Sequence, residues 1–90
     1  MALFTFVLEF DGGTYISQLR APSARRAVAQ YSSHLVGNTT VLTVSLRRRL
    51  ANALSEQNPV AIEGVRNVWC CSASFGRKFA LLNVVATAYR

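Results

Sequence analysis

The chain opens with an alternation of apolar and other residues that is typical of a β-strand. Every second residue from position 4 to position 10 is a phenylalanine or a leucine, and successive side chains of a strand point to opposite faces. The turn sequence Asp11-Gly12-Gly13 follows, with glycines that accept positive φ angles, and residues 14–20 alternate again. The pattern predicts an antiparallel hairpin with strands at 3–10 and 14–20.

After Pro22 the hydrophobic period changes from two residues to about 3.6, which predicts a helix. Ser23 caps this helix, which runs to about Leu35 and is closed by Gly37. A second helical period runs from Leu46 to Asn58-Pro59, where proline removes a backbone hydrogen-bond donor and stops the helix. The apolar faces that we expect to pack on a sheet are Ala24, Ala27, Val28, Tyr31 and Leu35 in the first helix and Leu46, Leu50, Ala53 and Leu54 in the second.

The second half of the chain predicts another hairpin. The turn is Gly76-Arg77, and the strands on either side are residues 65–75 and 78–88. Both strands are apolar on both faces, which is typical of strands in the middle of a sheet or of strands whose second face is covered by a partner. Residues 60–64 are expected to form a loop, and the β-prone residues 39–45 allow a short fifth strand. The predicted order is β-β-α-(β)-α-β-β. It describes one α+β domain over residues 1–90, an antiparallel sheet of two hairpins with two helices on one face.

The composition leaves little charge to cover the surface of this domain. Hydrophobic residues make up 51% of the 90 residues and charged residues only 16%. This excludes a disordered tail and predicts an exposed apolar patch on the sheet face without helices, so we expect a homodimer. The N-terminal segment lacks the basic leader of a signal peptide, and the last apolar run is too short to span a bilayer. A cytoplasmic protein without a membrane partner is therefore expected.

The basic residues are the clearest pointer to a partner. The net charge is +6, and nine of the ten basic residues are arginine. A balance of this size suits nucleic acid, an anionic membrane or an acidic protein, and does not choose among them. Ser23-Ala24-Arg25-Arg26 and Ser45-Leu46-Arg47-Arg48 each predict a serine-capped helix start with two arginines in its first turn. Because that turn carries free N–H groups and the positive end of the helix dipole, arginine there breaks the local preference for acidic residues.

We therefore predict an anion-binding site formed by Arg25, Arg26, Arg47 and Arg48 and extended by Arg20. The site requires that the fold brings both helix starts to the same end of the sheet. If it does not, the same arginines are expected to be solvated surface residues.

The arginines of the second helix do not form a single stripe. At about 100° per residue, Arg47, Arg48 and Arg49 fan around the helix. Arg47 and Arg49 flank the apolar face, and only Arg48 points squarely outward. This spread argues against a helix that reads bases in the major groove, which needs several polar side chains on one face.

No motif in the chain predicts catalysis. There is no P-loop, nucleophile elbow or His-Glu-x-x-His sequence. The adjacent Cys70 and Cys71 suit neither a disulfide framework nor a zinc site and are expected to be buried strand residues. His34, near a helix C-terminus, is expected to offset the helix dipole. Arg77-Lys78, between two phenylalanines, allows a basic tip that binds single strands, although an ordinary hairpin with a polar tip is the favoured interpretation.

These patterns predict a small, basic, non-enzymatic domain that self-associates and binds an anionic partner, with nucleic acid placed first. The alternative is a protein-interaction or assembly module without a nucleic-acid role, in which the same arginines pair with an acidic protein surface. No cofactor, metal or small-molecule substrate is expected in either case.

Overall fold

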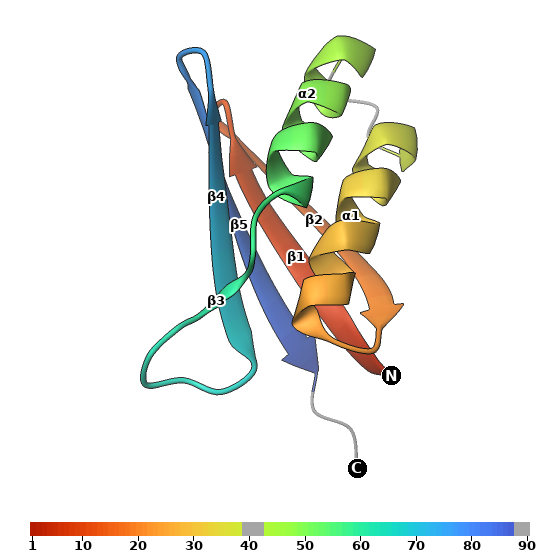
Figure 1. Cartoon of the computed structure of the whole chain (residues 1–90), viewed down its shortest axis with the longest axis vertical. Coiled ribbons are helices and arrows are strands. Elements are labelled where there is room, and N and C mark those ends of the chain that lie inside the picture. The colour runs from red at the N-terminus through yellow and green to blue at the C-terminus, as the bar shows by residue number, and fades with distance from the viewer. Residues whose placement is uncertain (39–42, 88–90) are drawn as a thin grey trace.

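Two helices cover one face of a five-stranded antiparallel sheet (Figure 1). The structure, a computed structural model, describes residues 1–38 and 43–87, and of residues 35–38, 44, 46 and 75 it describes the backbone alone. The predicted α+β class, with two hairpins and a helical layer, is confirmed. The elements are β1 (Ala2–Phe10), β2 (Gly13–Ala21), α1 (Ala24–Asn38), α2 (Val44–Ser55), β3 (Val60–Ala61), β4 (Val68–Phe75) and β5 (Lys78–Thr87).

The two hairpins lie side by side because β1 pairs with β5, in the sheet order β2-β1-β5-β4-β3. Both hairpin turns therefore meet at one end of the sheet, where Phe10 lies opposite Ala80. In the first turn Asp11 and Gly12 have φ angles of 51° and 80°. These left-handed conformations are the ones that a two-residue hairpin turn favours.

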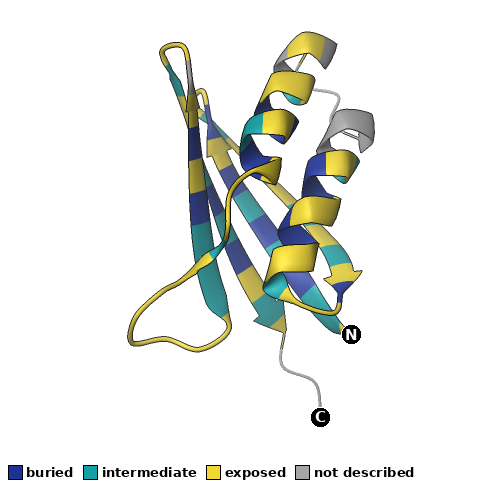
Figure 2. Cartoon of the chain, viewed as in Figure 1, coloured by how far each residue is buried: buried dark blue, intermediate teal, exposed yellow. Residues whose placement is uncertain are grey.

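The core lies between the sheet and the helices and is built from alternate strand residues, which appear as bands along each strand in Figure 2. Phe4, Phe6, Leu8 and Phe10 of β1 are each at most 3% exposed, as the opening alternation predicts. The ring of Tyr31 on α1 stacks on that of Phe6, with the ring centroids 4.5 Å apart. This aromatic contact ties the first helix to the centre of the sheet.

The described part of the segment predicted as a short fifth strand contains no strand. Of residues 39–45, positions 39–42 lie outside the described residues, and Val44 and Ser45 belong to α2. The fifth strand is instead β3, which pairs with Cys70 and Trp69 of β4 in a segment predicted to be a loop. An edge strand of two residues needs only a free row of backbone groups on its neighbour, so its own sequence carries almost no signal.

Two element boundaries also differ from the prediction. α1 continues through Gly37 to Asn38, since a glycine within a helix costs only about 1 kcal/mol. β4 begins at Val68 rather than at residue 65. Gly64 and Asn67, just before it, have φ angles of 87° and 60°, which an extended strand does not accommodate.

The sheet face opposite the helices exposes large apolar side chains. Ile16, at the middle of β2, is 68% exposed, and Phe79 and Val85 of β5 are 57% and 38% exposed. All three occupy the alternate strand positions that point away from the helices, so the apolar patch that the composition predicts is present on this face. We call it the open face. Its apolar residues are Leu3, Val7, Ile16, Val68, Cys70, Phe79, Leu81 and Val85; the polar residues Thr5, Gln18, Ser72 and Asn83 lie among them, and Glu9 and Arg20 lie at its two ends.

Candidate functional site

The two helix starts lie at opposite ends of the helical layer, because α1 and α2 run antiparallel (Figure 1). Arg25 and Arg26 begin α1 at one end, whereas Arg47 and Arg48 lie toward the start of α2 at the other. The condition for a single site at both helix starts is therefore not met. Arg20 is the last residue but one of β2, near the start of α1, but its side chain is exposed on the open face of the sheet.

The first helix start has the predicted geometry. The Ser23 Oγ accepts a hydrogen bond of 3.2 Å from the backbone N–H of Arg26. The Ser23 carbonyl accepts another, of 2.9 Å, from the N–H of Ala27. Ser23 is thus the N-cap, and Arg25 and Arg26 occupy a first turn that contains no acidic residue.

The second helix start is shifted by two residues from the prediction. The Thr43 carbonyl accepts a 3.0 Å hydrogen bond from the N–H of Arg47, which makes Thr43 the N-cap. Ser45 lies inside the helix, so the prediction that it caps α2 is wrong. Arg47 and Arg48 consequently belong to the second turn, where the free amides of the helix start are out of reach.

Arg47 lies on the buried side of α2 rather than at its flank. Leu50, Ala51 and Leu54 form the buried stripe of this helix, and Arg47 precedes them by three, four and seven residues. The Nε of Arg47 is fully buried and has no hydrogen-bond partner among the described residues. Its stem therefore packs in the core layer, and its Nε is not available to a ligand at the surface.

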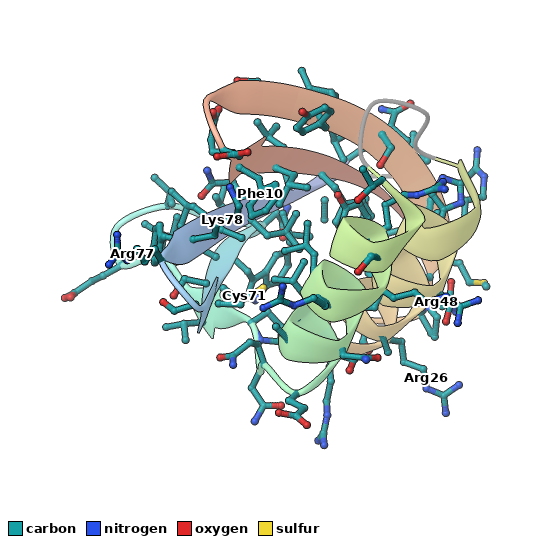
Figure 3. The ribbon with its side chains drawn as sticks, turned by 90° about the horizontal axis from the view of Figure 1, so that it is seen from above. Phe10, Arg26, Arg48, Cys71, Arg77 and Lys78 are labelled. Carbon is teal, nitrogen blue, oxygen red and sulfur yellow. The ribbon has the colours of Figure 1, made fainter. Side chains whose placement is uncertain are left out.

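A groove of about 240 Å³ runs between the helices on the side away from the sheet. Arg26 precedes the first groove residue of α1 by three positions, and Arg48 precedes Asn52 of α2 by four. Because the helices are antiparallel, an arginine lies beyond each end of the groove. Figure 3 shows Arg26 and Arg48 on the outer side of the helical layer. We call this surface the outer face; besides the two arginines it comprises the groove residues Ala29, Ser32, Ser33, Ala51, Asn52 and Ser55.

The positive charge of the helical layer is not neutralised from within. Neither α1 nor α2 contains an aspartate or glutamate. Arg25, Arg26 and Arg48 are exposed and form no ion pair with any described residue. The structure thus keeps three of the five predicted site arginines exposed on this layer, two at one end and one at the other.

A second basic surface lies where the two hairpin turns approach α2. A cleft of about 420 Å³ is lined by Asp11, Arg49, Gly76, Arg77, Lys78 and Phe79, and we call it the tip cleft. The Lys78 Nζ lies 3.0 Å from the Asp11 Oδ1, so an ion pair links the two turns. Figure 3 shows Arg77 and Lys78 across the molecule from Arg48. Arg77-Lys78 was the only sequence signal for this cleft, because the approach of Arg49 depends on the packing of α2 beside the turns.

The cysteines have the character of structural residues. Burial, together with the neighbouring Cys70, raises the pKa of the Cys71 thiol to about 11. The thiol is therefore protonated near neutral pH, and the protonated form is a poor nucleophile. Within residues 1–38 and 43–87, no group of three or more His, Cys, Asp and Glu side chains could hold a metal ion.

Comparison of the chain with protein-family models, curated proteins and solved structures finds no match. In the described part of the chain, no helix has both the length and the apolar composition needed to cross a membrane. Function is therefore inferred from the side chains and their placement.

Proposed function

We propose that the protein is a non-enzymatic domain that binds nucleic acid through the outer face of its helix pair. The observation that carries this proposal is the charge of the helical layer, since α1 and α2 together contain five arginines and no acidic residue. Arginines that neutralise phosphates release condensed counterions, which supplies most of the free energy of nonspecific binding. Arg26 and Arg48 of the outer face, together with the exposed Arg25 beside Arg26 at the start of α1, are the side chains that we expect to make these contacts.

The outer face is suited to phosphates rather than to bases. Arg26 and Arg48 are separated by roughly 15 Å along the helix axes, at a rise of about 1.5 Å per residue, which suits an extended strand better than a single ion. None of the exposed described side chains of α1 and α2 is aromatic, so bases find no ring on which to stack. We therefore expect binding that depends on charge and not on base sequence.

Fluorescence anisotropy with a labelled oligonucleotide, measured over a range of salt concentrations, tests this proposal. Three phosphate contacts predict a slope of about −2 to −3 for log K against log salt. For the Arg26→Gln/Arg48→Gln variant we expect a slope of log K against log salt that is less steep by about 1.5 to 2, because two phosphate contacts are lost. Arg66→Gln is the control for loss of charge outside the helices, since Arg66 is an exposed arginine in the loop before β4. It removes one positive charge, half of the change in the double variant.

Two results would contradict the proposal. One is an anisotropy that does not change with protein at low salt, and the other is a double variant that binds as the wild type does. Affinity for an acidic peptide without affinity for nucleic acid would instead support an assembly module that uses the same arginines.

We also propose that two copies associate through their open faces. Near the centre of the face Ile16 lies opposite Val7. Polar side chains lie beside this pair: Asn83 on the other side of Val7, and the hydrogen-bonded Thr5 and Gln18. Arg20 lies beside Leu3 at one end, and Glu9 lies opposite Thr14 at the other, six residues away along β1. In a face-to-face dimer whose two-fold axis lies between the two sheets and perpendicular to the strands, the strands of the two copies run in opposite directions. Arg20 of each copy would then lie over Glu9 of the other, so the face is complementary in charge to itself.

A further inference from the structure

We infer that the protein bridges two nucleic-acid molecules, one on each side of a dimer. The inference rests on the proposed function, because it requires both nucleic-acid binding by the outer face and association through the open face. The observation that carries it is the placement of these two surfaces. The helices cover one face of the sheet and the open face is the other, so the two surfaces lie on opposite sides of each chain (Figure 1).

Pairing of the open faces turns the two helical layers away from each other. A two-fold axis that lies between the two sheets reverses the direction normal to the sheets, whatever its angle to the strands. The dimer then has its layers in the order helices, sheet, sheet, helices. Arg26 and Arg48, on the outer side of the helical layer in Figure 3, therefore lie on one side of the dimer in one copy and on the opposite side in the other.

The two basic faces of the dimer are too far apart for one short duplex to contact both. At about 10 Å for each layer, the outer faces are separated by roughly 40 Å. DNA has a persistence length of about 50 nm, so a duplex of about 12 base pairs is a straight rod of roughly 40 Å. A duplex of this length that binds one face therefore leaves the opposite face free for a second.

The second duplex should bind with an affinity close to that of the first. By symmetry both faces present the same exposed arginines, Arg25, Arg26 and Arg48, and none of these forms an ion pair with a described residue. The repulsion between the two duplexes is screened, because a separation of roughly 40 Å is several times the Debye length of about 8 Å at physiological salt. The open face offers a second duplex little charge, since the charged residues among its described positions are Glu9 and Arg20, one of each sign.

Capture of a second duplex tests this inference on the full-length chain. A duplex of the length given above is fixed to beads, protein is added, and a fluorescent duplex of the same length is supplied in solution. We expect the wild type to retain the fluorescent duplex on the beads. The retained amount should fall again at a large excess of protein, because each duplex then occupies a dimer of its own. Single strands of the same number of nucleotides are tested in parallel, since the outer face also suits an extended strand.

Two variants that add the same charge separate bridging from binding. Ile16→Lys places an unpaired charge in the proposed interface, so it should still bind the immobilised duplex but retain no more fluorescent duplex than beads without protein. Gln30→Lys adds its charge at an exposed position of α1 and should bridge as the wild type does. Arg26→Gln/Arg48→Gln should retain less fluorescent duplex than the wild type, because both binding steps are weakened.

The outcomes separate bridging from the two proposals beneath it. An unchanged anisotropy shows that nucleic acid is not bound, a monomer in sedimentation shows that no dimer forms, and the inference falls with either. A dimer that binds oligonucleotide but retains no fluorescent duplex or strand would overturn the bridging alone. So would retention by a monomeric Ile16→Lys variant, since one chain would then hold two molecules. Retention that keeps rising with protein would indicate aggregation and would overturn it as well.

Discussion

Tyr31 of α1 and Phe6 of β1 stack with ring centroids 4.5 Å apart and ring planes 19° apart, at the centre of the core. Both side chains are at most 2% exposed. Replacing either by alanine removes apolar contacts and leaves a cavity, so we expect Phe6→Ala or Tyr31→Ala to lower the free energy of unfolding by about 3–5 kcal/mol. Urea denaturation measures this loss. The double variant should lose less than the sum, with a coupling of about 0.5–1.5 kcal/mol. Strict additivity would show that the stacked pair contributes only through burial.

The identity of the N-cap residue of each helix gives a second prediction. Ser23→Ala should lower the free energy of unfolding by about 1 kcal/mol, because the N–H of Arg26 loses its acceptor. Ser45→Ala is the matched control and should change stability by less than about 0.5 kcal/mol, since Ser45 lies inside α2. Equal losses in the two variants, measured by denaturation under the same conditions, would contradict the assignment of Thr43 as the cap of α2.

Stability should fall at alkaline pH because two buried groups resist ionisation. Burial raises the pKa of the Cys71 thiol from 9.0 to about 11 and raises that of the Tyr31 hydroxyl well above its usual range. Above about pH 9 the unfolded chain releases protons that the folded chain retains. The stabilisation is therefore complete below pH 9 and is lost as the pH rises toward 11. For Cys71 we expect a loss of about 1–3 kcal/mol.

Denaturation at a series of pH values checks this effect, with Cys71→Ala as the test and Cys70→Ala as the control. Cys71→Ala removes the buried thiol, so the decline between pH 9 and 10 should become shallower. Cys70, half-buried on the open face, contributes less than burial does to the raised pKa of the Cys71 thiol, so Cys70→Ala should keep most of the decline. A decline of equal steepness in both variants would show that the Cys71 thiol does not cause it.

The hairpins and the helical layer could be predicted because their signals are local. The alternation that buries Phe4 and Phe6 and the left-handed preference of Asp11-Gly12 act within a few residues of the chain. The pairing of β1 with β5 joins residues that are 70 (Phe10 and Ala80) to 84 (Leu3 and Thr87) positions apart, and no local pattern specifies it. The short strand β3 depends on the free edge of β4 and was missed for the same reason.

The candidate site was less predictable because it depends on the residue at which α2 begins and on which residues of α2 face the core. Thr43 and Ser45 are both capping residue types only two positions apart, so composition alone does not decide where α2 begins. The helical wheel centred on Leu46 placed Arg47 at the flank, whereas the buried stripe includes Ala51 and therefore runs through Arg47. The antiparallel arrangement of the helices, which separates Arg26 from Arg48, appears only in three dimensions.

Arg47 should limit the stability of the fold. Its Nε is a buried donor without an acceptor in the described part of the chain, and such a group costs about 1–3 kcal/mol. Arg47→Met keeps the length of the stem, removes the donor and has similar helix propensity, so we expect the free energy of unfolding to rise by about 1 kcal/mol. Arg48→Met, at an exposed position, should change it by less than about 0.5 kcal/mol. A destabilised Arg47→Met variant would indicate that the guanidinium has a favourable partner.

Self-association through the open face predicts a specific effect of charge at its centre. Ile16 is 68% exposed, so Ile16→Lys should change the stability of the folded chain little while burying an unpaired charge in the proposed interface. Sedimentation should show a dimer for the wild type and a monomer for Ile16→Lys. Gln30→Lys introduces the same charge at an exposed position of α1, on the opposite side of the molecule, and should remain a dimer.

The ends of the open face allow a test of its orientation. Arg20→Glu should weaken the dimer, because it would bring two carboxylates together in the proposed two-fold arrangement. Combining it with Glu9→Arg restores opposite charges at both ends and should recover the affinity lost in the single variant. The recovery distinguishes a reversed, face-to-face dimer from association by edge pairing of β2, in which Glu9 on the neighbouring strand β1 would not meet Arg20 of the other copy. A monomeric wild type at all concentrations, or a double variant no tighter than Arg20→Glu, would refute this dimer.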